Sequence, residues 1–169
     1  GKQAILSQHI GDLKNHETYL FYIESIERFS RLFRVKPLLA AYDMHPDYLS
    51  SVYAASLGIS ATPVQHHHAH IASCMAEHNL EECVIGVAMD GTGYGADGNI
   101  WGSEFFICDL LEYRRMTHFD YFPLPGGDSV TKEPWRTAMS ILWQAYGDEC
   151  LQIGLPFLET IDITKRKLL

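Results

Sequence analysis

Short apolar runs alternate with helical patterns through the first eighty residues of this 169-residue chain. Apolar runs predict strands at 2–9, 38–42 and 61–64. Apolar residues at steps of three and four predict a long helix that stops at Pro37, a second helix that starts at Pro46, and a third helix after the last of these strands. Strands that alternate with helices form βαβ units around a parallel sheet, so the sequence predicts an α/β fold.

The pattern changes after residue 80. A strand at 83–89 is followed by two strand-like stretches, 100–111 and 113–122, with no helix between them. This order predicts a β-meander with antiparallel pairing. A further helix is predicted from Pro134 to Gly147, and the weak pattern of 148–169 predicts irregular or short helical structure. We therefore expect two lobes, 1–82 with the βαβ units and 83–169 opened by the meander.

Four histidines, at positions 66, 67, 68 and 70, lie in the first turns of the third predicted helix. Residues four apart on a helix are neighbours, so His66 and His70 are expected to project side by side. His67 and His68 point elsewhere. Two imidazoles, completed by a carboxylate or water, form a typical site for a transition metal. The alternative is a solvated helix start, and the spacing does not choose between iron and zinc.

Asp90 directly follows the strand predicted at 83–89, and Gly91, Gly93 and Gly95 come after it. Glycine lets the backbone approach an anion closely and present its amides, and the carboxylate is a hard ligand for a cation shared with that anion. A tight hairpin, with or without bound phosphate, explains the same glycines. Ligands of α/β sheets gather at the carboxyl ends of strands, so we expect the histidine helix and the Asp90 segment to face each other across a cleft.

A second glycine turn, Gly126 and Gly127 followed by Asp128, is suited to binding a ribose through the carboxylate. Lys132 and Arg136 follow closely and are candidates to meet a phosphate or acyl-phosphate group. An exposed basic helix start is the alternative. No nucleophile paired with a base is identified, so the sequence assigns no catalytic residue.

The overall composition excludes several classes of protein. A formal net charge of −8 disfavours a broad nucleic-acid-binding surface. No stretch of about 20 apolar residues predicts a membrane span. Four separated cysteines with no CxxC pair favour a reduced, cytoplasmic protein.

The chain resembles the HypF family, the carbamoyltransferases of nickel–iron hydrogenase maturation. The resemblance covers most of 6–147 and rests on six blocks in the family's order. These are LSQHIGDL (6–13), HPDYLS (45–50), VQHHHAH (64–70), DGTGYG (90–95), WGSE (101–104), and LPGGD with PWR (124–128 and 134–136).

This resemblance implies an activity and a fold. Enzymes of the family make carbamoyl-adenylate from carbamoyl phosphate and ATP, and pass the carbamoyl group to the C-terminal cysteine of HypE. Dehydration there yields the cyanide ligands of the hydrogenase iron. The matched region is similar to the tRNA threonylcarbamoyl transferase and to the actin-like, sugar-kinase-like ATPase fold.

The resemblance also implies roles for individual residues. His66 and His70 match the first and fifth positions of the family's His-x-x-x-His metal motif, and Asp90 is implied as a third ligand. The implied nucleotide-binding residues are Gly91, Gly93, Gly95, Gly126, Gly127, Asp128 and Lys132.

Several parts of the family's enzyme have no match here: the acylphosphatase-like domain, the zinc fingers, the adenylate-forming domain and much of the ATPase-like fold. We therefore expect a partial domain that does not run the full reaction alone. Two alternatives remain, a threonylcarbamoyl-transferase-like enzyme that modifies tRNA and a non-catalytic module that docks HypE.

Overall fold

The computed structural model describes residues 4–162. It divides into two compact units, with the division between His118 and Phe119. Each unit is described by itself.

The first half of the first unit alternates helices and strands, as the sequence predicted. It contains α1 (His16–Leu32), β1 (Leu39–Asp43), α2 (Leu49–Ser56), β2 (Ser60–Val64) and α3 (His66–Glu77). Strands β1 and β2 pair in parallel from Leu39 with Ser60 to Asp43 with Val64. The α/β class and the parallel βαβ unit are thus confirmed.

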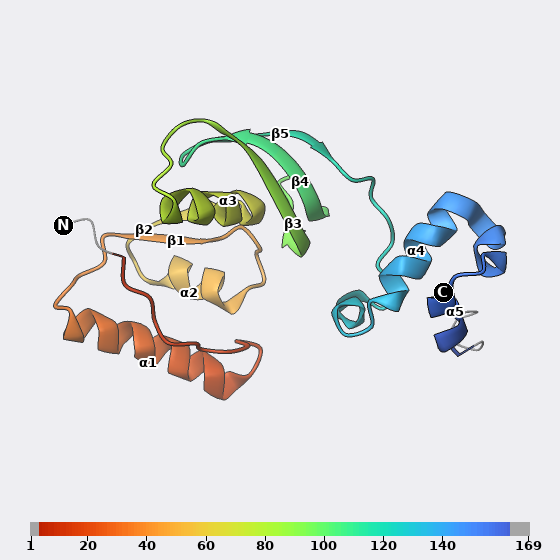
Figure 1. Ribbon diagram of the computed structural model, residues 1–169. Coiled ribbons are helices and arrows are strands. Elements are labelled where there is room, and N and C mark those ends of the chain that lie inside the picture. The colour runs from red at the N-terminus through yellow and green to blue at the C-terminus, as the bar shows by residue number, and fades with distance from the viewer. Residues whose placement is uncertain (1–3, 163–169) are drawn as a thin grey trace. The chain divides into compact units, whose positions relative to one another are not determined.

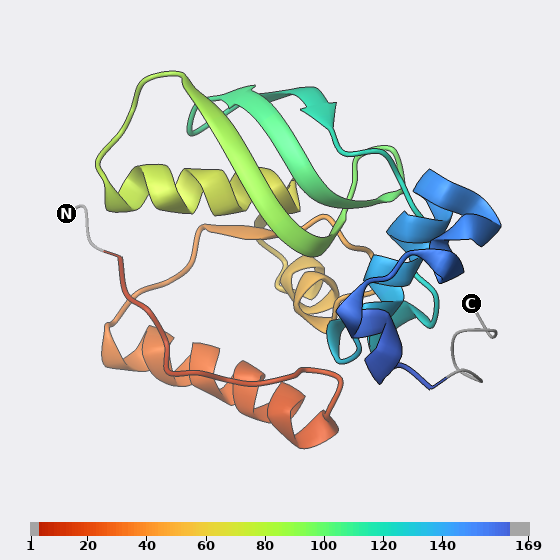
Figure 2. The same cartoon turned by 45° about the vertical axis from the view of Figure 1, so that its right-hand side comes forward.

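The second half of this unit is the predicted meander. Strands β3 (Val84–Tyr94), β4 (Ile100–Cys108) and β5 (Tyr113–His118) form an antiparallel sheet in the order β3-β4-β5. Figure 1 and Figure 2 show α3 between this sheet and the β1–β2 pair, with α1 and α2 on the far side of the pair. Helix α3 is therefore an internal layer that contacts β3.

Apolar side chains of α3 pack directly on the three-stranded sheet. The buried cluster joins side chains from α3, β3 and β4: Ile71, Met75, Ala88, Trp101, Phe106 and Cys108. Gly86 is needed at its centre because a Cβ there would overlap the side chain of Ile71. This cluster fixes the distance between α3 and β3, and so the distance between the side chains at their ends.

Two details of the sequence prediction are wrong. No strand forms at residues 4–9, where Leu6 is 91% exposed, because no neighbouring strand is available to accept the backbone hydrogen bonds. Residues 2 and 3 of that prediction lie outside the described part of the chain. The strand predicted at 83–89 also ends later than expected, since β3 continues to Tyr94 and the turn comes at 95–99, as in the hairpin alternative.

The second unit is helical within its described residues. It contains η1 (Gly127–Thr131), α4 (Trp135–Tyr146), η2 (Gly147–Gln152) and α5 (Pro156–Thr160), packed around Met139, Cys150, Leu158 and Ile161. The predicted helix from Pro134 to Gly147 is confirmed, and so are short helical turns after it. Residues 163–169 of that prediction lie outside the described part.

The predicted lobe boundary between residues 82 and 83 remains a prediction. Strands β3 to β5 belong to the same compact unit as α1 to α3.

No helix within residues 4–162 is both long enough and apolar enough to cross a membrane.

Two isoleucines in this unit give a matched test of the packing between α3 and β3. Ile71 on α3 is 7% exposed, whereas Ile85 on β3 is 80% exposed. Ile71→Ala is expected to lower the free energy of unfolding by about 2–5 kcal/mol through lost burial and a residual cavity. Ile85→Ala should change it by less than about 0.5 kcal/mol. Urea denaturation followed by circular dichroism measures both, and equal losses would contradict this packing.

Candidate metal centre

The first turn of α3 is held in place by Gln65, the residue before the helix. Its backbone is extended, and its side-chain oxygen accepts a hydrogen bond from the amide of His68 at 2.8 Å, which caps the helix. The side-chain amide of this buried glutamine also donates to the carbonyl of Tyr94 at the end of β3, at 3.3 Å. The helix start is thereby tied to the strand that contains Asp90.

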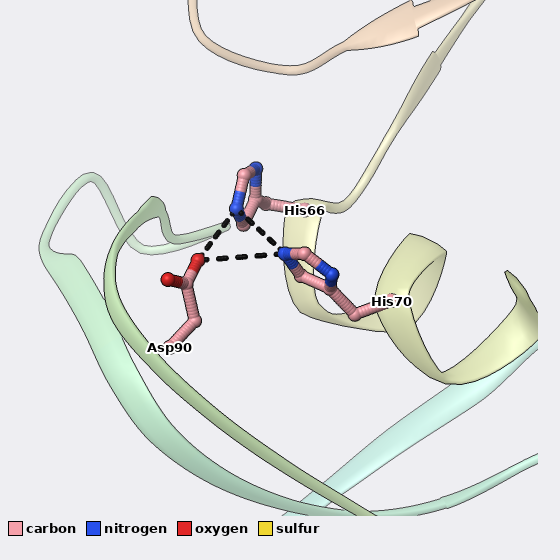
Figure 3. A group of neighbouring side chains, drawn as sticks. All are labelled: His66, His70 and Asp90. Carbon is pink, nitrogen blue, oxygen red and sulfur yellow. Dashed lines mark hydrogen bonds and ion pairs between the residues drawn. The ribbon is translucent and has the colours of Figure 1, made fainter. Parts of the chain in front are cut away.

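His66 and His70 lie one helical turn apart and project toward the same point, as the spacing predicted. Their Nε2 atoms are 3.2 Å apart. Asp90 Oδ2 lies 2.7 Å from Nε2 of His66 and 3.5 Å from Nε2 of His70. Figure 3 shows the three side chains converging, two from α3 and one from β3. The structure therefore brings together the three residues predicted as metal ligands.

Asp90 owes its direction to an irregularity in β3. Regular pairing with β4 stops at Met89 and resumes at Gly93, so Asp90 lies in the shifted stretch between them. Such bulges re-aim side chains at the edges of sites. The amide of Gly91 donates to Asp90 Oδ1 at 2.7 Å and leaves Oδ2 directed at the histidines.

Two of the three glycines after Asp90, Gly93 and Gly95, allow other side chains to approach the backbone closely. A Cβ on Gly93 would lie 2.6 Å from ring atoms of both His66 and His67, and a Cβ on Gly95 would overlap Trp101. The amide of Gly95 donates to the carbonyl of Asn99 at 2.8 Å within the turn. Nothing lies within 4 Å of the Cβ position of Gly91. Their role toward a nucleotide remains a prediction.

The charges around His66 favour its protonated form when no cation is bound. Burial acts to lower the pKa of His66, but hydrogen bonds and charges from Asp43 and Asp90 outweigh it and raise that pKa above its ordinary value. Burial acts to raise the pKa of Asp90, but His66 and the amide of Gly91 reverse this effect and lower it. Burial lowers the pKa of His67, which favours a neutral ring.

Asp43 is a residue of this cluster that the sequence reasoning missed. Its Oδ2 lies 2.6 Å from Nδ1 of His66, on the side of the ring away from Asp90. The available signal was its place at the end of β1, where it pairs with Val64 two residues before His66. Because the carboxyl ends of parallel strands meet at one edge of a sheet, this pattern could have suggested that Asp43 lies near His66.

The three donor atoms fit a divalent cation. They lie within 4.8 Å of one another, at separations of 2.7, 3.2 and 3.5 Å. Ligands at about 2.0–2.2 Å from one ion stand about 2.8–3.6 Å apart in octahedral or tetrahedral geometry. The side chain of His70 is 58% exposed, which leaves the site accessible on one side. Two imidazoles with one carboxylate suit either zinc or ferrous iron.

The other predicted nucleotide-binding residues belong to the second unit. Gly126 and Gly127 have left-handed backbone angles, φ 95° and 54°, as a tight glycine turn requires. Lys132 is exposed. Arg136 pairs with Glu133 at 2.6 Å and lies over the ring of Trp135. The side chain of Asp128 lies outside the described set, and the roles of these residues remain predictions.

The chain matches the models of a known protein family. Residues 1–77 match the HypF Kae1-like domain, and residues 86–168 match the second subdomain of the carbamoyltransferase Kae1-like domain. Carbamoyltransferase HypF2 of Cupriavidus necator is 45% identical over 84% of this chain and 18% of its own length. Carbamoyltransferase HypF of Synechocystis is 45% identical over 87% of this chain and 19% of its own.

Solved structures agree with these matches. A full-length HypF in a phosphate- and nucleotide-bound form superposes with a TM-score of 0.81 at 49% identity, over 96% of this chain and 25% of that one. The HypF of T. kodakarensis gives a TM-score of 0.73 at 44% identity, over 83% of this chain and 19% of that one. This chain spans about a fifth of the curated relatives described above. It belongs to the HypF carbamoyltransferase family, in which it matches the Kae1-like domain.

Proposed function

We propose that this chain is the carbamoyl-transfer domain of a HypF-type enzyme. In this proposal it passes the carbamoyl group of carbamoyl-adenylate to the C-terminal cysteine of HypE, toward the cyanide ligands of nickel–iron hydrogenase. The supporting observation is the convergence of His66, His70 and Asp90 in a chain of this family. A partial actin-like, sugar-kinase-like ATPase fold and a cytoplasmic location belong to the same proposal, the fold because the match is to a Kae1-like domain.

Three side chains are proposed to bind a cation. Nε2 of His66, Nε2 of His70 and Oδ2 of Asp90 are the proposed ligands of a divalent cation, iron or zinc. Such a cation, when bound, supplies a Lewis acid for the phosphate and carbamoyl oxygens of the adenylate. Because the side chain of His70 is exposed, the adenylate could approach the cation from that side.

Two groups of residues are proposed to bind nucleotide, one in each compact unit. In the first unit, Gly91, Gly93 and Gly95 at the end of β3 are proposed to bind a phosphate through their backbone. In the second unit, Gly126, Gly127, Asp128 and Lys132 are proposed to bind a ribose and a phosphate charge. A similar full-length HypF was solved in a phosphate- and nucleotide-bound form, which supports nucleotide binding within the family.

Two other functions have some support. The Kae1-like match is compatible with a tRNA threonylcarbamoyl transferase, but the net charge of −8 and the HypF relatives disfavour it. A module that only docks HypE is compatible with a chain that spans about a fifth of its relatives. Carbamoyl transfer separates these functions.

A transfer assay distinguishes the enzyme from the docking module. The metal-loaded chain is mixed with preformed carbamoyl-adenylate and HypE, and the product is followed by mass spectrometry. We expect carbamoylation of the C-terminal cysteine above the rate without the chain, and none when that cysteine is replaced by serine. The chain alone should not form carbamoyl-adenylate from carbamoyl phosphate and ATP. HypE binding with transfer at the background rate would support the docking module instead.

The metal ligands are tested by single replacements. Outer-shell partners of metal ligands typically contribute about 10- to 100-fold in affinity, so loss of a ligand in His66→Ala or His70→Ala should weaken zinc binding more than about a hundredfold. His78→Ala is the matched control, an exposed histidine at the end of the same helix. His67 is unsuitable because its side chain is completely buried. Equal zinc affinity in all three variants, by calorimetry, would count against this ligand set.

The approach of β3 to α3 is tested by two glycine variants. Neither Gly91 nor Gly93 has a positive φ, so alanine fits the backbone at both positions. The methyl group of Gly93→Ala would displace the ring of His66, and we expect zinc affinity to fall by about 10- to 100-fold. Gly91→Ala meets open space and should bind zinc as the unchanged chain does. The idea is wrong if the two variants bind zinc equally.

A further inference from the structure

We propose that Asp43 is a positioning residue that orients the ring of His66 and holds its proton on Nδ1, so that Nε2 is available to the cation. The inference rests on the proposed metal-binding role of His66 and adds a fourth residue, from a different strand, to that site. Asp43 does not contact the cation in this proposal. It acts through His66.

The contact between these residues is short and sheltered. Oδ2 of Asp43 lies 2.6 Å from Nδ1 of His66, and both side chains are mostly buried. The distance is that of a strong, charge-assisted hydrogen bond. The opposite nitrogen of the same ring, Nε2, is the one that faces His70 and Asp90.

Asp43 is held by one hydrogen bond to its carboxylate and by two hydrogen bonds of the backbone around it. Its Oδ1 accepts the backbone N–H of His45 at 2.8 Å. Its backbone carbonyl accepts the hydroxyl of Ser51 from α2 at 2.8 Å. The amide of Met44 donates to the carbonyl of Val64 at 3.1 Å, which extends the β1–β2 pairing beyond Asp43. Oδ2 therefore has one direction, toward His66.

An ionised carboxylate only accepts hydrogen bonds, so Nδ1 of His66 must donate to it. In the neutral ring that binds a metal, the lone pair is then on Nε2, where the other two ligands lie. His70 differs from His66 in this respect. Its side chain is more exposed, and among the described residues no hydrogen bond to its Nδ1 is found. Asp43 therefore orders one of the two histidines.

The amide of His45 makes replacement by asparagine informative. The backbone N–H of His45 needs an acceptor, and the NH₂ group of asparagine only donates, so the side-chain oxygen introduced by Asp43→Asn stays with His45. The new NH₂ group then faces Nδ1 of His66 and donates to it. The proton of the ring moves to Nε2, which loses the lone pair needed for the cation. Asp43→Ala removes the partner and allows both tautomers, so it should be the milder change.

Zinc titration of the 169-residue chain tests this order. We expect Asp43→Asn to weaken zinc binding about a hundredfold and Asp43→Ala about tenfold, the range typical of outer-shell partners. Asp47→Asn removes the same charge from an exposed side chain nearby and should leave the affinity unchanged. A merely structural role predicts the reverse order, because asparagine keeps the shape of aspartate. An asparagine variant that binds zinc as well as the alanine variant overturns the proposal.

A second measurement does not depend on metal. Proton–nitrogen correlation spectra of the imidazole rings in the metal-free chain report which ring nitrogen holds a proton. We expect Nδ1 of His66 to be protonated in the unchanged chain and unprotonated in Asp43→Asn, with His70 the same in both. Should the unchanged chain bind no zinc, the metal function fails and these spectra alone decide the role of Asp43. Protonated Nδ1 in both proteins would refute it.

Discussion

The contact between the first turn of α3 and the irregular stretch of β3 determines the site. Burial of Ile71 against Gly86 sets the spacing of the two elements, and Gln65 joins the helix start to Tyr94. Gly93 leaves room for the histidine rings. Because these contacts lie outside the ligand set, the ligands are ordered by packing and hydrogen bonds that need no cation. The proposed metal site is in this sense preorganised by the fold.

The cluster combines two carboxylates with a histidine between them. Asp43 and Asp90 contact opposite nitrogens of His66 and raise its pKa, which favours a proton on Nε2 when no cation is bound. Binding of a divalent cation at Nε2 must displace that proton. The same negative charge would favour a divalent cation more than a proton, since the cation has two charges and would also contact His70 and Asp90.

The sequence predicted what depends on local pattern. Periodicity predicted the long helix before Pro37 and the helix from Pro134 to Gly147, which form at 16–32 and 135–146. The spacing of His66 and His70 predicted that their rings lie side by side. Prediction from the sequence failed where pairing between distant segments decides. Residues 4–9 are apolar enough for a strand, but no strand pairs with them within residues 4–162. The segment after Asp90 continues β3 because β4 pairs with it again at Gly93. Asp43 was missed for the same reason, since its position follows from the register of β1 against β2.

The central claim is that one cation is bound between α3 and β3 by two imidazoles and a carboxylate. X-ray absorption spectroscopy of the chain loaded with one equivalent of zinc or ferrous iron tests it most directly. We expect a first shell of nitrogen and oxygen at about 2.0–2.2 Å, with the outer-shell scattering of two imidazole rings. A shell that contains sulfur, or one without imidazole scattering, would contradict the claim.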